Sequence, residues 1–289
     1  MNYKIVSDSS SNIFSVEGRN YTTVPMKIIA RHREFVDTAD LNLQSMVDFL
    51  KEYKGKSGSS CPNVQEWLDA FGDADMVFGV TITKNLSGSY NAAQQAAATY
   101  MEENPGKKAY IFDSLSAGPE LMLIVDKIAE LANQGCDFDT IVSGVLDYHN
   151  HTHTVFCLES MLNLARNGRV SMAVAKIAGM LGIRVVGIAL DGQVTPVHKP
   201  RGAKKATQTI VEMLKERGFE DGNILRVAHC YAPEAAQALR EAILAQFPNT
   251  RFMLEHTTAL CSFYAEAGGL IIGFEGAFNT ENDNGKYYH

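Results

Sequence analysis

The chain has 289 residues, which is long enough for two domains that each bury a core. Its formal net charge of −7 argues against a general nucleic-acid-binding protein, and 46% hydrophobic with 20% charged residues is typical of a soluble globular protein. The five cysteines are widely spread, and no pair has metal-finger spacing. Together with the strand-like start at residues 1–6, which is unlike a signal peptide, this favours a cytoplasmic protein with reduced thiols.

The first half of the chain alternates predicted strands and helices. Because consecutive strands joined by helical crossovers lie parallel, this pattern predicts a parallel sheet. One segment, residues 21–37, departs from the alternation and predicts a short hairpin. The other expected elements are strands at 4–7, 76–83 and 109–112, and helices at 90–101 and 119–133.

The second half mixes predicted antiparallel strands with helices. Residues 185–190 and 193–198 flank Asp191-Gly192, a strong signal for a two-residue hairpin loop. Further strands are expected at 155–158, 224–230, 251–256 and 270–274, and helices at 202–217 and 233–247. The predicted fold is therefore α/β with two domains, a parallel-sheet domain at residues 1–153 and a mixed-sheet domain at residues 154–289.

Three serine-rich segments, Asp8–Ser11, Ser57–Ser60 and Ser87–Ser89, are predicted turns between loops and helices. Hydroxyls and free backbone N–H groups at helix starts can bind the oxygens of an anion. Helix capping by the same serines is the structural alternative. Two such turns could face a common point, so we expect a site for a carboxylate or a phosphate.

An enzymatic alternative is a hydrolase that acts on a small acid or ester at the same serine-lined cleft. Such an enzyme needs a serine activated by a positioned histidine and an acid, and no Gly-x-Ser-x-Gly elbow occurs. Neither a phosphate loop nor a dinucleotide motif is present, so no cofactor is expected. His149, His151 and His153 alternate as metal ligands on a strand could, but a predicted helix end there favours surface histidines and no metal.

Basic residues cluster at two places in this acidic chain. Arg169 follows a predicted helix end, and a second cluster contains Lys199, Arg201, Lys204 and Lys205. A solvated helix face is one interpretation. The other is docking of an acidic partner or an anion.

A set of short motifs follows a fixed order along nearly the whole chain: Ile5–Ser10, Val24–Met26, Phe35–Asp37, Ser59–Pro62, Leu86–Tyr90, Asp113-Ser114, Leu158-Glu159 and Asn167–Ser171. In this order, the motifs resemble those of the DegV family of bacterial fatty-acid-binding proteins.

The resemblance implies two α/β domains that hold a long-chain fatty acid in an interdomain tunnel. It also implies a non-catalytic carrier, which presents the carboxylate to an ATP-dependent fatty acid kinase for acyl phosphate formation. Transient contact with a membrane surface is a further expectation. The residues expected to bind the fatty acid are Ser59, Ser60, Ser87, Gly88, Ser89 and Glu266, and those expected to dock the partner are Arg169, Arg201, Lys204 and Lys205.

Two positions depart from the family pattern. Ser59 stands where the family has a threonine, which keeps the hydroxyl and loses a methyl, and the second departure is at Glu266. The family's His-x-Gly-Pro-Gly element corresponds to Glu266–Leu270, so Glu266 stands where the family has a histidine near the head group. A carboxylate there would repel an ionised ligand unless it is protonated or turned away. His256 is an alternative donor to the head group.

Overall fold

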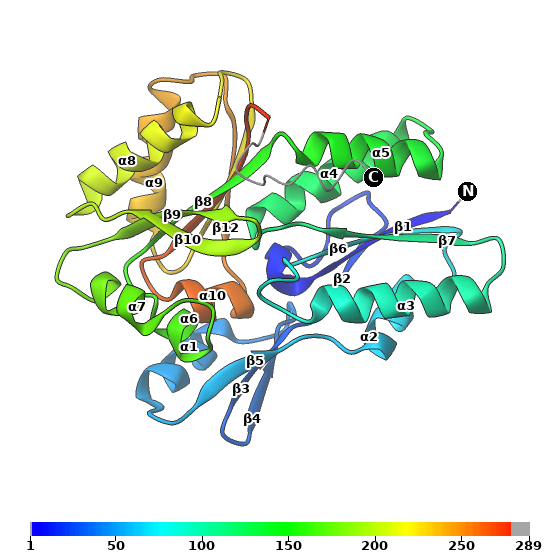
Figure 1. Cartoon of the computed structure of the whole chain (residues 1–289), viewed down its shortest axis with the longest axis horizontal. Coiled ribbons are helices and arrows are strands. Elements are labelled where there is room, and N and C mark those ends of the chain that lie inside the picture. The colour runs from blue at the N-terminus through cyan, green and yellow to red at the C-terminus, as the bar shows by residue number, and fades with distance from the viewer. Residues whose placement is uncertain (1, 279–289) are drawn as a thin grey trace. The chain divides into compact units, whose positions relative to one another are not determined.

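The computed structural model describes residues 2–278 (Figure 1). Contacts divide the chain into two units. Unit 1 comprises the chain up to Ala117, Leu121–His149 and Thr258–Leu260, and unit 2 comprises Gly118–Glu120, Asn150–Thr257 and the chain from Cys261 on. The boundary that the sequence predicts between residues 153 and 154 is a separate statement from this division into contact units, and it stays a prediction.

Unit 1 is built on a four-stranded parallel sheet in the order β2-β1-β6-β7. Its central strand β6 is buried along its whole length, which explains its unbroken apolar sequence. The predicted parallel sheet is confirmed. The strands are β1 (Tyr3–Asp8), β2 (Tyr21–Val24), β6 (Met76–Thr81) and β7 (Lys108–Asp113).

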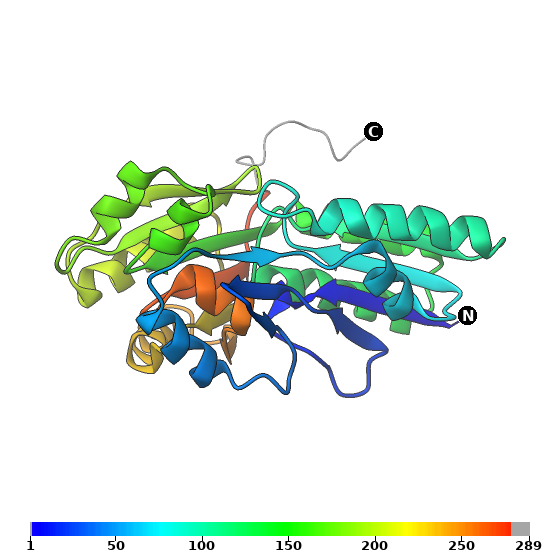
Figure 2. The same ribbon diagram turned by 90° about the horizontal axis from the view of Figure 1, so that it is seen from below.

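Helices cover both faces of this sheet. Val77 packs with α2 (Val64–Phe71) and α3 (Ser89–Glu103), whereas Phe78 packs with α4 (Pro119–Asn133) and α5 (Phe138–His149). Figure 2 shows the long helix α3 running along the sheet. Alternate residues of one strand thus fill two separate apolar cores.

A small antiparallel sheet, in the order β4-β3-β5, completes unit 1 together with α1 (Leu43–Glu52). The predicted hairpin is present as β3 (Lys27–Ala30) and β4 (Arg33–Val36). The prediction of a turn at Ser57–Ser60 was wrong, because these residues form the edge strand β5. Pairing with β3 satisfies backbone groups that a turn would leave to solvent or side chains.

Unit 2 contains a six-stranded mixed sheet in the order β10-β9-β8-β13-β11-β12. Only the pair β11 and β12 is parallel, so the predicted mixed sheet is confirmed. Asp191 and Gly192 both have positive φ, as the tight hairpin between β9 and β10 requires. The strands are β8 (Thr152–Leu158), β9 (Val185–Leu190), β10 (Gln193–His198), β11 (Ile224–His229), β12 (Arg251–His256) and β13 (Leu270–Glu275).

The two faces of this sheet carry different helices. Cys157 faces a core formed with α8 (Ala203–Glu216) and α9 (Pro233–Leu244). Phe156 faces the opposite core, which includes α6 (Leu162–Arg166) and α7 (Met172–Ala178). A further helix, α10, spans Ala259–Ala265.

Two of the three alternating histidines, His149 and His153, are buried and do not lie on the surface as predicted. His149 ends α5 and is 5% exposed, and its Nε2 donates to the carbonyl of Ser114 at 2.9 Å. His153 is 4% exposed on β8, and its Nε2 donates to the carbonyl of Ala277 at 2.9 Å. Both rings fill core space, and no group of three or more His, Cys, Asp or Glu within residues 2–278 is arranged to hold a metal ion.

In the part of the chain that the structure describes, no helix is both long enough and apolar enough to cross a lipid bilayer.

Candidate functional site

The buried carboxylate of Asp8 ties together two of the serine segments. Its oxygens accept hydrogen bonds from the Ser10 hydroxyl, from the Ile82 N–H at 2.9 Å and from the Ser89 hydroxyl at 2.7 Å. Burial raises the pKa of Asp8, and the bonds from Ser10 and Ser89 act in the opposite direction. Because β1 and β6 are parallel neighbours, their carboxyl ends bring Asp8 beside the loop that enters α3.

The Ser87–Ser89 loop offers one serine to solvent and buries the other. Ser89 is fully buried and its hydroxyl is used by Asp8, whereas Ser87 is half-buried and Gly88 is exposed. The Ser87 Oγ accepts the Ser89 N–H at 3.2 Å. A serine hydroxyl that accepts one bond can still donate its proton, so Ser87 can bind an anion and Ser89 holds the loop.

The end of β5 lies against this loop. A Cβ placed on Gly88 would be 3.3 Å from the Cys61 Sγ, so the thiol packs against the Gly88 backbone. Ser59 and Ser60, which immediately precede Cys61, pair through their backbones with Ile28 and Lys27. The structure therefore brings the Ser59–Cys61 and Ser87–Ser89 segments together within unit 1. The following helix α2 is capped by Asn63, not by a serine of this segment.

A second buried carboxylate, Asp37, organises the same unit. It accepts the N–H groups of Ala259 at 2.8 Å and Leu260 at 3.1 Å, which are the first residues of α10. The hydroxyls of Ser9 and Thr258 add bonds at 2.9 and 3.1 Å. Burial raises the pKa of Asp37, while these four bonds oppose that rise. Asp37 thus anchors Thr258–Leu260 within unit 1.

Glu266, which belongs to unit 2, has a structural partner. Its φ is +54°, and its Oε1 accepts the N–H of Asn163 at 3.0 Å, in the first turn of α6. The Asn163 side chain donates in return to the carbonyl of Phe263 at 2.8 Å. One oxygen of the carboxylate is therefore turned toward a helix start, where a negative charge is favourable.

His256, the alternative donor, is exposed at the end of β12 beside the buried ring of His229. The two ring centroids lie 4.3 Å apart. Burial, and after it the neighbouring His256, lower the pKa of His229. The Nδ1 of His229 accepts the Ala232 N–H at 3.3 Å, which a neutral imidazole can do.

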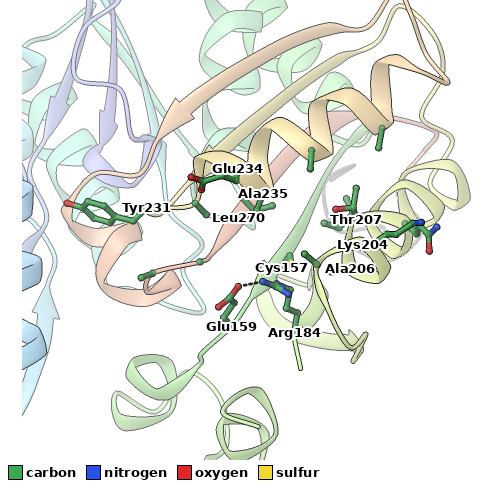
Figure 3. A pocket seen from close by; sticks show the side chains of 18 residues that line it. Cys157, Glu159, Arg184, Lys204, Ala206, Thr207, Tyr231, Glu234, Ala235 and Leu270 are labelled. Carbon is green, nitrogen blue, oxygen red and sulfur yellow. Dashed lines mark hydrogen bonds and ion pairs between the residues drawn. The ribbon is translucent and has the colours of Figure 1, made fainter. Parts of the chain in front are cut away.

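Unit 2 also contains a cavity of about 810 Å³ between α8, α9 and the sheet (Figure 3). Its walls are mostly small or apolar. Cys157 and Leu270 come from the sheet, and burial raises the pKa of the Cys157 thiol to about 12. The helices contribute Ala203, Ala206, Ile210, Ala235, Ala238 and Ala242.

An ion pair lies at one side of the cavity. Figure 3 shows the guanidinium of Arg184 paired with the carboxylate of Glu159. Glu159 also packs closely on the turn that precedes β13, because a Cβ on Gly268 would lie 2.6 Å from its Cδ. Only a glycine with φ of +92° leaves space for the carboxylate there. Sequence reasoning missed this cavity, although the alanine spacing of α9 was a usable signal.

The predicted docking residues all belong to unit 2 but differ in their surroundings. Arg169 lies over the ring of Tyr264, 5.6 Å from its centroid. Arg201, Lys204 and Lys205 are exposed at the start of α8. The structure therefore clusters three of the four cations at one helix end.

Comparison with known proteins shows which family this chain belongs to. Residues 2–275 match the family described as "Uncharacterised protein, DegV family". A DegV domain-containing protein from Streptococcus gordonii is 36% identical over 280 residues, covering 95% of this chain and 99% of the relative.

Two similar solved structures each have a TM-score of 0.92, covering 95% of this chain and 99% of theirs. One is a DegV family protein from Eubacterium eligens loaded with heptadecanoic acid, at 36% identity. The other is the Streptococcus pneumoniae Fatty Acid Kinase (Fak) B3 protein loaded with linoleic acid, at 37% identity.

Proposed function

Because this chain belongs to the DegV family, we propose that it binds a long-chain fatty acid and presents the carboxylate to an ATP-dependent fatty acid kinase. The kinase would form the acyl phosphate, and this chain would be a cytoplasmic, non-catalytic lipid-binding subunit. The heptadecanoic and linoleic acids in the two similar structures support the ligand class. The name of the pneumococcal relative supports the kinase partner.

The cavity of unit 2 is the observation that carries this proposal. Its 810 Å³ lies within the roughly 300–1,000 Å³ common for small-molecule sites. A sixteen-carbon chain would bury on the order of 14 methylenes at about 0.8 kcal/mol each. This gain of about 11 kcal/mol is of the same order as the cost of association, about 4–15 kcal/mol, so contacts to the head group must add to the affinity. The acyl chain is assigned to this cavity, with the alanines of α8 and α9 leaving room for it.

For the head group we retain Ser59, Ser60, Ser87 and Gly88 as the proposed carboxylate ligands. The proximity of Cys61 to Gly88 supports a shared site within unit 1. Ser89 does not contact the ligand in this proposal. Its hydroxyl donates to the Asp8 carboxylate and so fixes the loop that carries Ser87 and Gly88. Glu266, with one oxygen on Asn163, would border the ligand without providing a positive charge.

The hydrolase alternative gains no support. The buried Ser89 hydroxyl donates to a carboxylate rather than to a histidine base. The similar structures are described by the fatty acids they hold.

Mass spectrometry of denatured protein, purified without added lipid, tests the proposal directly. We expect a long-chain fatty acid in the extract and a higher melting temperature when fatty acid is added to stripped protein. Absence of lipid together with no thermal shift would contradict the proposal.

Replacing both Ser59 and Ser87 with alanine tests the head-group assignment. Hydrogen bonds to a charged group contribute about 1.5–3 kcal/mol, so the dissociation constant for a fatty acid should rise at least about tenfold. Binding of the methyl ester should change little, because that ligand has no carboxylate. Ser143→Ala, on the exposed side of α5, is the control. Equal affinity of the double variant and the control for the acid would refute the assignment.

A further inference from the structure

A pair of opposite charges forms part of the wall of the unit 2 cavity, although most of that wall is small or apolar. Figure 3 shows Arg184 and Glu159 paired at one side of the cavity. The other charged residues that line it, Lys204 and Glu234, are exposed. The Arg184 side chain is 21% exposed, so a guanidinium reaches the cavity from a largely buried position.

Pairing of two strands brings these charges together. Leu158 at the end of β8 pairs with Val185 at the start of β9 in an antiparallel register. Glu159 and Arg184 are the next residues outward, so they continue this register as an opposed pair. The Arg184 N–H also donates to the Pro200 carbonyl at 3.0 Å. The backbone therefore fixes both positions independently of any ligand.

Strand alternation directs both side chains to the face of the sheet that carries α8 and α9. Cys157 and Val186 face the core formed with these helices, and Glu159 and Arg184 each lie two residues away. Burial raises the pKa of the Cys157 thiol to about 12, the Arg184 guanidinium opposes this rise, and Glu159 adds to it. Both charges therefore lie near the buried thiol that lines the cavity.

The guanidinium keeps hydrogen-bond donors for a ligand. An arginine side chain has five N–H donors. Among residues 2–278, the Arg184 side chain donates only to the Glu159 carboxylate. That carboxylate is itself held against the turn before β13, since a Cβ on Gly268 would lie 2.6 Å from its Cδ. An oxygen inside the cavity can therefore bind Arg184 without displacing its partner.

The chemistry of the pair suits a hydroxyl group better than a plain hydrocarbon. Methylenes that displace water from a charged group leave its hydrogen bonds unmade, which costs free energy. A second carboxylate on the acyl chain would be attracted by Arg184 but repelled by Glu159. A hydroxyl fits both charges, because its oxygen accepts from the guanidinium while its O–H donates to the carboxylate.

We propose that the Arg184–Glu159 pair binds a hydroxyl group on the acyl chain, so that the cavity selects hydroxy fatty acids over unsubstituted ones. This inference rests on the proposed function, because it requires the acyl chain to occupy the cavity. The carboxylate of the ligand stays with the serine segments. A site built to hydrogen-bond a hydroxyl discriminates strongly, since an analogue without that hydroxyl leaves polar groups unpaired.

Titration of lipid-stripped protein with octadecanoic acids that carry one hydroxyl, at carbon six, nine, twelve, fifteen or eighteen, tests this selection. At least one isomer should bind at least about tenfold more tightly than octadecanoic acid, as expected for a hydrogen bond to a charged group. The keto acid with its oxygen at the same carbon should bind more weakly than that isomer, because a carbonyl cannot donate to Glu159. A wild type that prefers none of the hydroxy acids overturns the inference, and so does equal binding of the keto acid.

Removing both charges tests whether the pair is responsible. Arg184→Met with Glu159→Gln keeps side chains of similar length, and it should reduce the preference for the best hydroxy acid to less than about threefold. Octadecanoic acid should bind this variant more tightly, since its methylenes then meet no charged group. The measured quantity is the ratio of the two dissociation constants, which a general loss of stability does not change. A ratio that stays at the wild-type value overturns the inference.

Arg19→Met with Asp126→Asn is the matched control. This pair in unit 1 also joins an arginine to a carboxylate, its side chains are 29% and 19% exposed, and neither residue lines the cavity. The control should keep the wild-type ratio, and an equal loss of preference in both double variants overturns the assignment. Failure of the proposed function gives a different result, because then neither octadecanoic acid nor any hydroxy acid binds the wild type. Binding of octadecanoic acid without any preference contradicts this inference alone.

Discussion

At the scale of single residues, Glu266 caps the start of the short helix α6. Its carboxylate accepts the Asn163 N–H, so Glu266→Ala should lower the free energy of unfolding by about 1 kcal/mol, whereas Glu266→Gln keeps an acceptor and should cost less. Because the charge is turned toward α6, Glu266→Gln should change the fatty acid dissociation constant less than about threefold. Urea unfolding and ligand titration measure the two effects. Much tighter binding by Glu266→Gln would show that the carboxylate repels the ligand.

His229 makes the stability of the protein depend on pH. Burial, with His256 beside it, lowers the pKa of His229 below its ordinary 6.5, so the unfolded chain binds a proton that the folded chain resists. The free energy of unfolding should therefore fall as pH drops below 6.5. Urea unfolding on both sides of pH 6.5 should show a smaller fall for His229→Asn. An NMR titration midpoint of His229 at or above 6.5 would contradict this prediction.

At the scale of helices, the alanines of α9 determine how much space the cavity offers. Ala235, Ala238 and Ala242 line it, whereas Gln237 lies on the exposed side and bonds to Glu241. Ala235→Leu should weaken binding of an eighteen-carbon acid by about tenfold, since overfilling a packed site costs about 1–3 kcal/mol. A twelve-carbon acid should be less affected. Gln237→Leu is the control, and an equal effect of both variants on the longer acid would place the acyl chain elsewhere.

At the scale of the whole molecule, the ligand should stabilise one unit more than the other. Ligand at about 100 times its dissociation constant adds about 2.7 kcal/mol to the free energy of unfolding. Since the cavity lies within unit 2, amides of α8, α9 and β8 should gain the most protection from hydrogen exchange when stripped protein is reloaded. Protection confined to unit 1 would refute the acyl assignment.

Much of the fold could be predicted, because the order of strands and helices and the position of tight turns follow from local sequence patterns. Alternation of apolar strands with helices indicated the parallel sheet, and Asp191-Gly192 indicated the hairpin of unit 2. The sequence predicts a turn at Ser57–Ser60, because four small polar residues show no strand pattern. Pairing with β3 makes them a strand instead. Sequence spacing predicts surface positions for His149 and His153, but it does not reveal the tertiary partners that bury both rings.

The amino-acid order by itself determined the fold class, the family resemblance and the serine segments that could meet an anion, because strand periodicity, turn chemistry and motif order are local properties. Only the tertiary structure decided which hydroxyls are already used, such as Ser89 on Asp8, and that Glu266 caps α6. It also decided that small residues of α8 and α9 line a cavity and that Ile183 forms a bridge with Arg201. These features depend on contacts between segments far apart in the chain, which packing creates and local sequence does not encode.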